Sequence, residues 1–313
     1  MVKITPVIKL KTAYEIIFSP DDDNFAFISD RNVGIMSVSS QKLLFKTPAV
    51  IHPGNIDFSP DGQCLVVKST SGGIKILNAQ DGSVQKDFMN QKEGEGSRAY
   101  FSKCGCCVVT VSWSGLLSVR DRYTTETIYR ESSQGCIFNN LSTPLDRSFF
   151  VYSLGSRPVS GSEPPPKDKV ILRRWPFTLD TNNYFELPQQ WPFIVDLKVS
   201  PSGRFLGVIY GAPPRTIEIF DLKKLEVIMR QNAVFGGTGY SLDWSNDEKL
   251  IAVNCNNQVQ IFNFPDLSLQ HQIPIKYPCF VGFSTSSKFI SLGSWCQSFI
   301  VPIKYLNEFK LKI

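Results

Sequence analysis

The chain has 313 residues, of which 42% are hydrophobic and 12% aromatic, so it can bury a sizeable core. Its apolar runs fall short of the roughly 20 residues that a membrane-spanning helix needs, and residues 1–6 contain no apolar segment of a secretory signal. The net charge of +5 is mild, so it permits an acidic or nucleic-acid partner without requiring one. A soluble protein without a membrane span is expected.

The N-terminal segment predicts a first group of β-strands, at residues 13–18, 24–29 and 33–38. Residues 3–10 form a further candidate strand whose partner would lie elsewhere in the chain. The triplet Asp21-Asp22-Asp23 falls on the first hairpin turn, where aspartate is favoured because its side chain bonds to nearby backbone. Calcium-loop spacing with a closing glutamate is absent.

Residues 55–88 are the clearest copy of a repeated unit. Candidate strands at residues 56–58, 64–68, 74–77 and 84–88 are separated by the dipeptides Asp61-Gly62, Gly72-Gly73 and Asp81-Gly82. Such dipeptides supply the positive φ that tight hairpin turns need, so each break is a reversal of the chain. The stretch predicts a meander of four antiparallel strands.

The segment Phe58-Ser59-Pro60-Asp61-Gly62 has echoes along the whole chain. Its aromatic or apolar anchor recurs about every 40 residues, a period typical of propeller blades. The anchors are Phe18, Phe58, Phe101, Leu141, Val199, Trp244 and Phe283. We therefore predict an all-β fold in which residues 1–313 form a single β-propeller of about seven four-stranded blades.

One segment interrupts this period in the fourth blade. Residues 155–169, GSRPVSGSEPPPKDK, are rich in proline and should be extended rather than folded. A long irregular loop in a compact repeat protein is usually functional or disordered.

The last blade must be completed by a terminal strand, because an open blade would expose a pairing edge. Residues 3–10 and residues 309–313 compete for this place. We favour the N-terminal strand, since joining the first and last segments in one sheet locks the ring.

The repeated motif carries a resemblance to a known family. Through Phe58-Ser59-Pro60-Asp61-Gly62 and third strands such as residues 217–221, the chain resembles the WD40-type β-propeller superfamily over nearly its whole length. It lacks the Gly-His and Trp-Asp dipeptides of that family, for which Arg120-Asp121 and Phe220-Asp221 are the nearest substitutes. More locally, residues 195–222 look like the propeller of eukaryotic translation initiation factors of the 2A kind, and this likeness implies RNA or ribosome binding.

The eight cysteines lie along the chain without regular spacing, which indicates reduced core thiols and an intracellular, reducing location in cytoplasm or nucleus. Cys104-Gly105-Cys106-Cys107 resembles half of a metal site, but no second Cys or His pair lies at ligand spacing. We expect a turn followed by buried thiols there.

Residues for catalysis are sparse. His52 and His271 are the two histidines, and they fall far apart in the predicted ring, away from any nucleophile. A metal-dependent hydrolase would need inward ligands, for which the first strands offer Glu15, Asp57, Asp196 and Asp243 in mixed register. We therefore expect no enzyme activity, no cofactor, no metal and no small-molecule substrate.

Loops after the second and fourth strands of every blade must emerge on one face, and that face collects residue types that anchor partners. The candidate partner-binding residues are Arg98, Trp113, Arg157, Pro164, Pro165, Pro166, Lys167, Trp191, Arg215 and Trp295. Tryptophans at strand ends also pack between blades, and this alternative stays open for each.

The sequence thus predicts a non-catalytic scaffold that binds protein partners through this face, as a subunit of a larger complex. A translation-associated propeller that binds RNA or the ribosome is the alternative, and a metal-dependent propeller hydrolase is a third.

Overall fold

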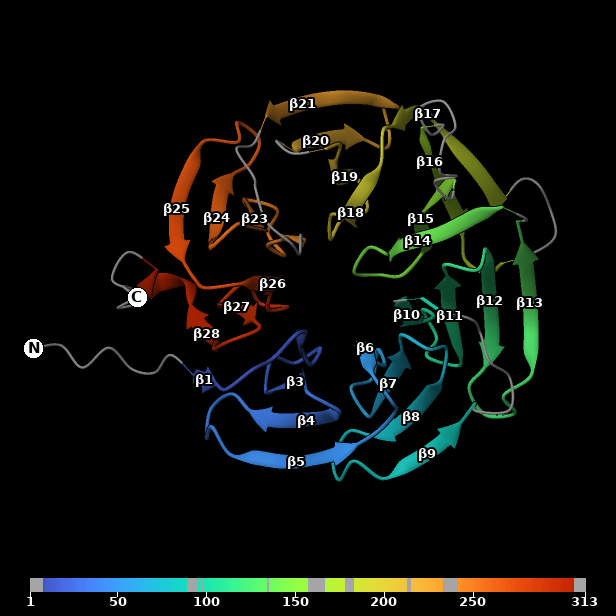
Figure 1. Cartoon of the computed structure of the whole chain (residues 1–313), viewed down its shortest axis with the longest axis vertical. Coiled ribbons are helices and arrows are strands. Elements are labelled where there is room, and N and C mark those ends of the chain that lie inside the picture. The colour runs from blue at the N-terminus through green and yellow to red at the C-terminus, as the bar shows by residue number, and fades with distance from the viewer. Residues whose placement is uncertain are drawn as a thin grey trace, which may run out of the picture.

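The chain folds into a ring of seven four-stranded antiparallel sheets, as predicted (Figure 1). The computed structural model describes residues 8–88, 95–96, 98–133, 135–156, 167–177, 183–212, 215–232 and 241–306. In six of the seven sheets consecutive strands follow one another from the axis to the rim, so these blades are local meanders.

The strands have the following bounds. Blade 1 holds β2 (Ile16–Phe18), β3 (Asn24–Ser29), β4 (Asn32–Ser37) and β5 (Leu43–Pro48), and blade 2 holds β6 (Pro53–Phe58), β7 (Cys64–Ser69), β8 (Ile74–Asn78) and β9 (Val84–Asp87). Blade 3 holds β10 (Arg98–Phe101), β11 (Cys107–Ser112), β12 (Leu116–Asp121) and β13 (Thr127–Ser132), and blade 4 holds β14 (Cys136–Ser142), β15 (Phe149–Ser156), β16 (Asp168–Arg174) and β17 (Tyr184–Trp191).

The second half of the ring repeats this order. Blade 5 holds β18 (Ile194–Val199), β19 (Phe205–Tyr210), β20 (Thr216–Asp221) and β21 (Glu226–Asn232), and blade 6 holds β22 (Leu242–Trp244), β23 (Leu250–Cys255), β24 (Gln258–Asn263) and β25 (Leu269–Pro274). Blade 7 holds β26 (Pro278–Phe283), β27 (Phe289–Ser294), β28 (Ser298–Pro302) and β1 (Ile8–Leu10). Within the described residues, η2 (Ile303–Tyr305) is a short 3-10 turn, and no helix there is long and apolar enough to cross a membrane.

The N-terminal strand closes the ring, which confirms the favoured alternative. β1 pairs antiparallel with β28, with Ile8 opposite Ile300 and Leu10 opposite Ser298. Ala13 then bridges to Ser294 before the chain enters blade 1. The competing segment, residues 309–313, lies outside the described residues. Because the first and last parts of the chain share one sheet, the ring cannot open without breaking this pairing.

The core lies between neighbouring blades. Every residue of β7 and of β11 is buried, because each second strand has another blade on both of its faces. The outermost strands β5 and β9 are mostly exposed. Each fully buried valine or leucine contributes about 1.5–3 kcal/mol, so the interfaces between blades hold most of the apolar stabilisation.

The repeated Ser-Pro-Asp-Gly segment forms the turn between the first and second strands. In blade 2, the Ser59 hydroxyl donates to Asp61 Oδ1 at 2.5 Å and accepts from the Cys64 amide at 2.9 Å. Gly62 has a φ of +70°, which favours glycine. The turn is thus closed by local hydrogen bonds, and this explains why it is visible in the sequence.

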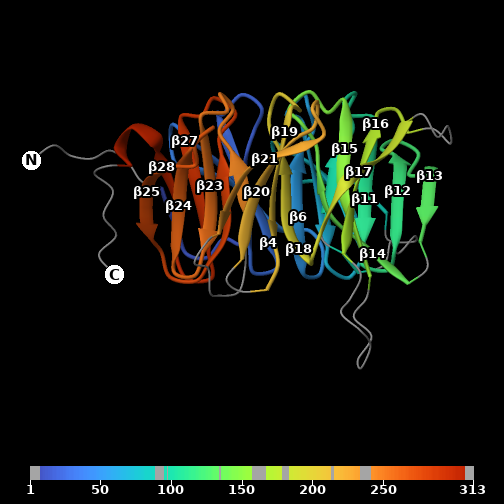
Figure 2. The same cartoon turned by 90° about the horizontal axis from the view of Figure 1, so that it is seen from above.

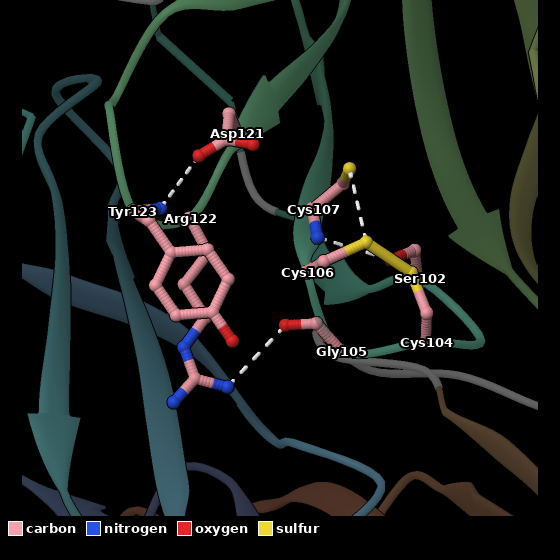
Figure 3. Close-up of a disulfide and its surroundings, with 8 residues drawn as sticks. All are labelled: Ser102, Cys104, Gly105, Cys106, Cys107, Asp121, Arg122 and Tyr123. Atoms are coloured by element: carbon pink, nitrogen blue, oxygen red, sulfur yellow. Dashed lines mark hydrogen bonds between the residues drawn. A yellow bond between two sulfur atoms is a disulfide. The ribbon is translucent and has the colours of Figure 1, made fainter.

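The cysteines depart from the prediction at one place. Cys104 and Cys106 form a disulfide, so the prediction of free thiols is wrong for this pair (Figure 3). The turn brings their Cα atoms to 5.3 Å, within the usual range for a disulfide. Cys64, Cys107 and Cys255 are free and buried as expected; the remaining free thiols are the half-buried Cys136 and Cys279 and the exposed Cys296.

Candidate functional site

One face of the ring carries all connections that follow a second or a fourth strand. We call it the insertion face, because β15 ends and β16 begins on it. Seen edge-on in Figure 2, the strands run between this face and the opposite one. The opposite face carries the tight turns after first and third strands.

Exposed large apolar side chains gather on the insertion face. Trp295 is 55% exposed, Phe193 60% and Tyr277 53%, and each lies in a connection on this face. Two further members of the set are Ile51 and Trp113. The opposite face exposes Tyr123, Leu145 and Leu225. A face with several exposed aromatic groups is typical of an interaction surface, whereas single exposed apolar residues are normal.

Neighbouring side chains hold these aromatic rings in place. The Trp295 ring lies 4.3 Å from the Tyr14 ring, centroid to centroid. The Trp113 indole donates to Asn139 Oδ1 at 3.2 Å. The guanidinium of Arg215 lies 5.9 Å from the centre of the Phe193 ring. These contacts orient the rings without covering them.

The backbone at Phe193 and Tyr277 is unusual. Their φ angles are +53° and +52°, a left-handed conformation that bulky residues rarely adopt. The Gly211 amide donates to the Phe193 carbonyl at 3.1 Å, and the Trp295 amide donates to the Tyr277 carbonyl at 3.1 Å. Leu225 and Leu267, in turns of the opposite face, have φ angles of +61° and +51°, so this conformation belongs to the turns of the repeat and is not specific to the insertion face.

Basic residues outnumber acidic ones among the described residues in the connections and strand ends of this face. The six basic members are Lys11, Arg31, Arg98, Lys167, Arg215 and Lys276, and the five acidic members are Glu15, Asp30, Asp87, Glu95 and Asp168. Asp168 accepts a hydrogen bond from the Ile194 amide and is half-buried, so its charge serves the fold. The two sets are nearly balanced, and the cations beside the exposed rings are Arg215, next to Phe193, and Lys276, next to Tyr277.

The structure places the predicted contact residues unevenly. Trp113, Lys167, Arg215 and Trp295 lie on the insertion face, of which Trp113, Lys167 and Trp295 are exposed and Arg215 is half-buried. Arg98 is the first residue of β10, and it lies at the insertion-face end of the central channel. Its side chain pairs with Glu15. The remaining predicted positions, Arg157, Pro164, Pro165 and Pro166, lie outside the described residues.

Trp191 requires a correction, because its side chain is fully buried and is not available to a partner. Its indole donates to Glu218 Oε1 at 2.9 Å. The other carboxylate oxygen accepts from the Tyr210 hydroxyl and from Arg230 Nε, both at 2.9 Å. Burial, and then the bond to Glu218, raises the pKa of Tyr210 to about 12. For Trp191 the packing alternative is the right one.

The inward aspartates of the channel join neighbouring blades. Asp57 accepts from the Phe101 amide of the next blade at 2.8 Å. Asp196 does the same with the Leu242 amide at 2.9 Å, and Asp243 with the Phe283 amide at 2.7 Å. Each carboxylate therefore satisfies a backbone donor of the adjacent first strand. Asp57 and Asp243 come one residue before the anchor of their blade and Asp196 comes three residues before it, yet all three accept a first-strand amide of the next blade.

Basic side chains face the same carboxylates. Arg98 Nη1 lies 3.4 Å from Glu15 Oε1, and Lys198 Nζ lies 3.3 Å from Asp243 Oδ1. Burial raises the pKa of Glu15 and of Asp196 above their usual values. Burial alone would lower the pKa of Lys198, but the neighbouring Asp243 carboxylate raises it. Paired charges, such as Arg98 with Glu15 and Lys198 with Asp243, therefore surround the axis of the ring.

Arg147 is a channel residue that sequence reasoning missed. It binds both Asp57 oxygens, at 2.6 and 3.0 Å, and donates to the carbonyls of Phe101 and Phe58 at 2.7 and 3.1 Å. It occupies the left-handed turn position that Gly62 holds in blade 2, with a φ of +50°. The sequence signal that could have revealed it is an arginine at the turn position where blade 2 has Gly62.

A cavity of about 220 Å³ lies at the channel mouth on the opposite face, with Tyr100, Arg147 and Lys198 in its wall. Asp57 and Asp243 also line it. Within the part of the chain that the structure describes, no group of three or more His, Cys, Asp or Glu side chains is placed to hold a metal ion. The channel carboxylates bind backbone amides of neighbouring blades, and in this way they join the blades.

The chain is a seven-bladed β-propeller with several exposed aromatic side chains on its insertion face. No protein-family model matches the chain, and no curated protein matches it. Among solved structures, it is similar to a chain of Kuenenia stuttgartiensis hydrazine synthase, with a TM-score of 0.77 and 14% sequence identity. The match covers 94% of this chain and 96% of that one. At this identity the likeness shows the fold alone.

Proposed function

We propose that this propeller is a non-catalytic scaffold of the WD40 type that binds a protein partner through the insertion face, as a subunit of a larger assembly. The observation that carries the proposal is the set of exposed aromatic rings on that face, among them Phe193 and Tyr277. Aromatic residues and arginine are enriched where partners anchor, and binding energy concentrates in a few such groups.

The charge of the face suggests the chemistry of the partner. Arg215 and Lys276 lie against the rings of Phe193 and Tyr277, at 5.9 and 5.2 Å. A partner segment that combines apolar anchors with carboxylates would match both the rings and the cations. The expected partner is an acidic protein surface rather than a small molecule.

The arrangement of the titratable groups supports a non-catalytic role. The inward aspartates are occupied by backbone amides of neighbouring blades. His52 lies in the connection before β6, whereas His271 lies in β25 of blade 6. A nucleophile, a base and an orienting group must lie within hydrogen-bond reach of each other, and these two histidines belong to separate blades.

The first experiment compares matched surface variants. The full chain, a Phe193→Ala/Trp295→Ala variant and a Tyr123→Ala control on the opposite face are expressed in cells of the source organism and recovered by affinity purification with quantitative mass spectrometry. Tyr123 is also aromatic and is 59% exposed. We expect the double variant to recover at least tenfold less of the specific partner than the wild type does, and the control to recover the same amount as the wild type. Equal recovery with all three proteins would contradict the proposal.

A second variant tests the inserted segment. Residues 157–166 lie between the described ends of β15 and β16, so a short Gly-Ser linker can replace them while both strands remain. We expect partner recovery to fall while the melting temperature stays unchanged. Nuclease treatment distinguishes the alternative, because recovery that disappears on digestion of RNA would favour the RNA-binding propeller.

A further inference from the structure

Blade 3 closes the repeated turn with sulfur where other blades use a carboxylate. Ser19, Ser59 and Ser245 each donate to the aspartate two residues later, at 2.5, 2.5 and 2.7 Å. In blade 3 the residue two positions after Ser102 is Cys104, and the Ser102 oxygen lies 3.3 Å from its sulfur. Since the turn forms in other blades without cysteine, its geometry does not require this pair.

The two cysteines flank the glycine of the turn (Figure 3), and they differ in exposure. Cys104 is exposed, and Cys106, bonded to it, is half-buried. Arg122 Nη1 donates to the carbonyl of Gly105, the residue between them, at 3.3 Å. The other terminal nitrogen, Nη2, donates to Cys64 Sγ at 2.8 Å, so Arg122 joins this turn to blade 2.

A third sulfur lies behind the disulfide. Cys107 Sγ is 3.7 Å from Cys106 Sγ. Because Cys106 is part of the disulfide and has no proton on sulfur, the Cys107 thiol is the donor of this contact. Cys107 is buried, so it is shielded from external thiols but is placed to stabilise a negative charge that develops on Cys106.

We propose that Cys104 and Cys106 form a reversible dithiol–disulfide site that exchanges electrons with a small thiol such as glutathione. The inference does not depend on the proposed partner binding, since the pair lies in a turn of the opposite face. Exposed disulfides are typical of labile and regulatory pairs, whereas structural disulfides resist reduction by glutathione.

The reaction is a pair of thiol–disulfide exchanges. An external thiolate attacks the exposed Cys104 sulfur, a new sulfur–sulfur bond forms, and the bond to Cys106 breaks. Cys106 leaves as a thiolate that accepts the hydrogen bond from Cys107 and then takes a proton from solvent. A second external thiolate attacks the external sulfur of the mixed disulfide and releases Cys104. Two thiols are thus oxidised to a disulfide while the protein disulfide gains two electrons.

The other described thiols are poorly suited to this reaction. Burial raises the pKa of Cys255 to about 12, and burial together with the Glu15 charge raises that of Cys279 to about 12. Burial also raises the pKa of the Cys64 thiol, although Arg122 Nη2 donates to its sulfur at 2.8 Å. Cys296 is exposed and free, so it serves as an internal control without a neighbouring disulfide.

The direct test is a redox titration of the full chain in mixtures of reduced and oxidised glutathione, followed by alkylation and peptide mass spectrometry. We expect one two-electron transition that involves Cys104 and Cys106, while the other cysteines form no intramolecular disulfide. Excess dithiothreitol should reopen the pair. A pair that stays reduced at every glutathione ratio, that never reopens, or that bonds to a different cysteine would overturn the proposal.

Variants taken from the repeat itself supply the controls. Cys104→Asp/Cys106→Gln recreates the Asp61-Gly62-Gln63 turn of blade 2, so it should fold and lose all dependence of its melting temperature on reductant. Cys107→Ala removes the donor to Cys106 and should slow reduction by about fivefold, while Cys107→Ser, which keeps a donor, should not. Cys296→Ser should leave the rate unchanged. Equal rates for Cys107→Ala and Cys107→Ser would refute the role given to Cys107.

Discussion

Replacement of Asp57 by alanine should destabilise the ring, because its carboxylate joins three blades. Asp57 belongs to blade 2, accepts the Phe101 amide of blade 3 and binds Arg147, which comes from blade 4. The two side chains are only 11% and 16% exposed. Removal of one partner of a buried ion pair costs about 3–5 kcal/mol, because the other charge is left without compensation.

The structure refines this magnitude. Arg147 keeps its bonds to the carbonyls of Phe101 and Phe58 in the variant, so we expect a loss near the lower limit, about 3 kcal/mol. A suitable control is Glu226→Ala, since Glu226 pairs with Lys224 at 3.4 Å and both side chains are more than half exposed. This pair should contribute less than about 1 kcal/mol.

Urea unfolding followed by circular dichroism and tryptophan fluorescence measures both free energies of unfolding. Arg147→Ala and the double variant Asp57→Ala/Arg147→Ala complete a double-mutant cycle that isolates the pairwise energy. The reasoning is refuted if Asp57→Ala costs no more than Glu226→Ala, or if the losses of the single variants simply add.

Two further predictions concern buried polar groups. Trp191→Phe removes the donor to Glu218 and should cost about 1–3 kcal/mol in urea unfolding, whereas Trp295→Phe at the exposed face should cost almost nothing; similar losses would contradict the assignment of Trp191 to the core. Burial raises the pKa of Glu15 above its ordinary 4.5, so the folded state binds the proton of this carboxyl more tightly than the unfolded state does. The free energy of unfolding of the wild type, relative to that of Glu15→Gln, should therefore fall as the pH rises from about 4.5 through the raised pKa. A difference that is constant with pH would contradict this.

The fold was predictable because its signals are local. The turn around Ser59, Asp61 and Gly62 is closed by bonds that span at most five residues, and its copies recur once per blade. The closing strand followed from a general argument as well, since an unpaired last blade would leave an edge. Periodicity and edge pairing together were sufficient for the seven-bladed ring.

The site was less predictable, because its contacts join distant positions. The role of Trp191 depends on Glu218, 27 residues away in another blade, and the role of Arg147 depends on Asp57, 90 residues away. No spacing rule connects such pairs before the ring is assembled. The disulfide was missed for a different reason: the sequence showed a turn at Gly105, but the proximity of Cys104 to Cys106 depends on the conformation of that turn.

The most direct test of partner binding through the insertion face is hydrogen–deuterium exchange of the chain, alone and in its purified assembly. We predict slower exchange on assembly in the connections that carry Trp113, Phe193, Tyr277 and Trp295, with unchanged exchange in the turns of the opposite face, such as the one that carries Tyr123. Protection confined to the opposite face would contradict the proposed function.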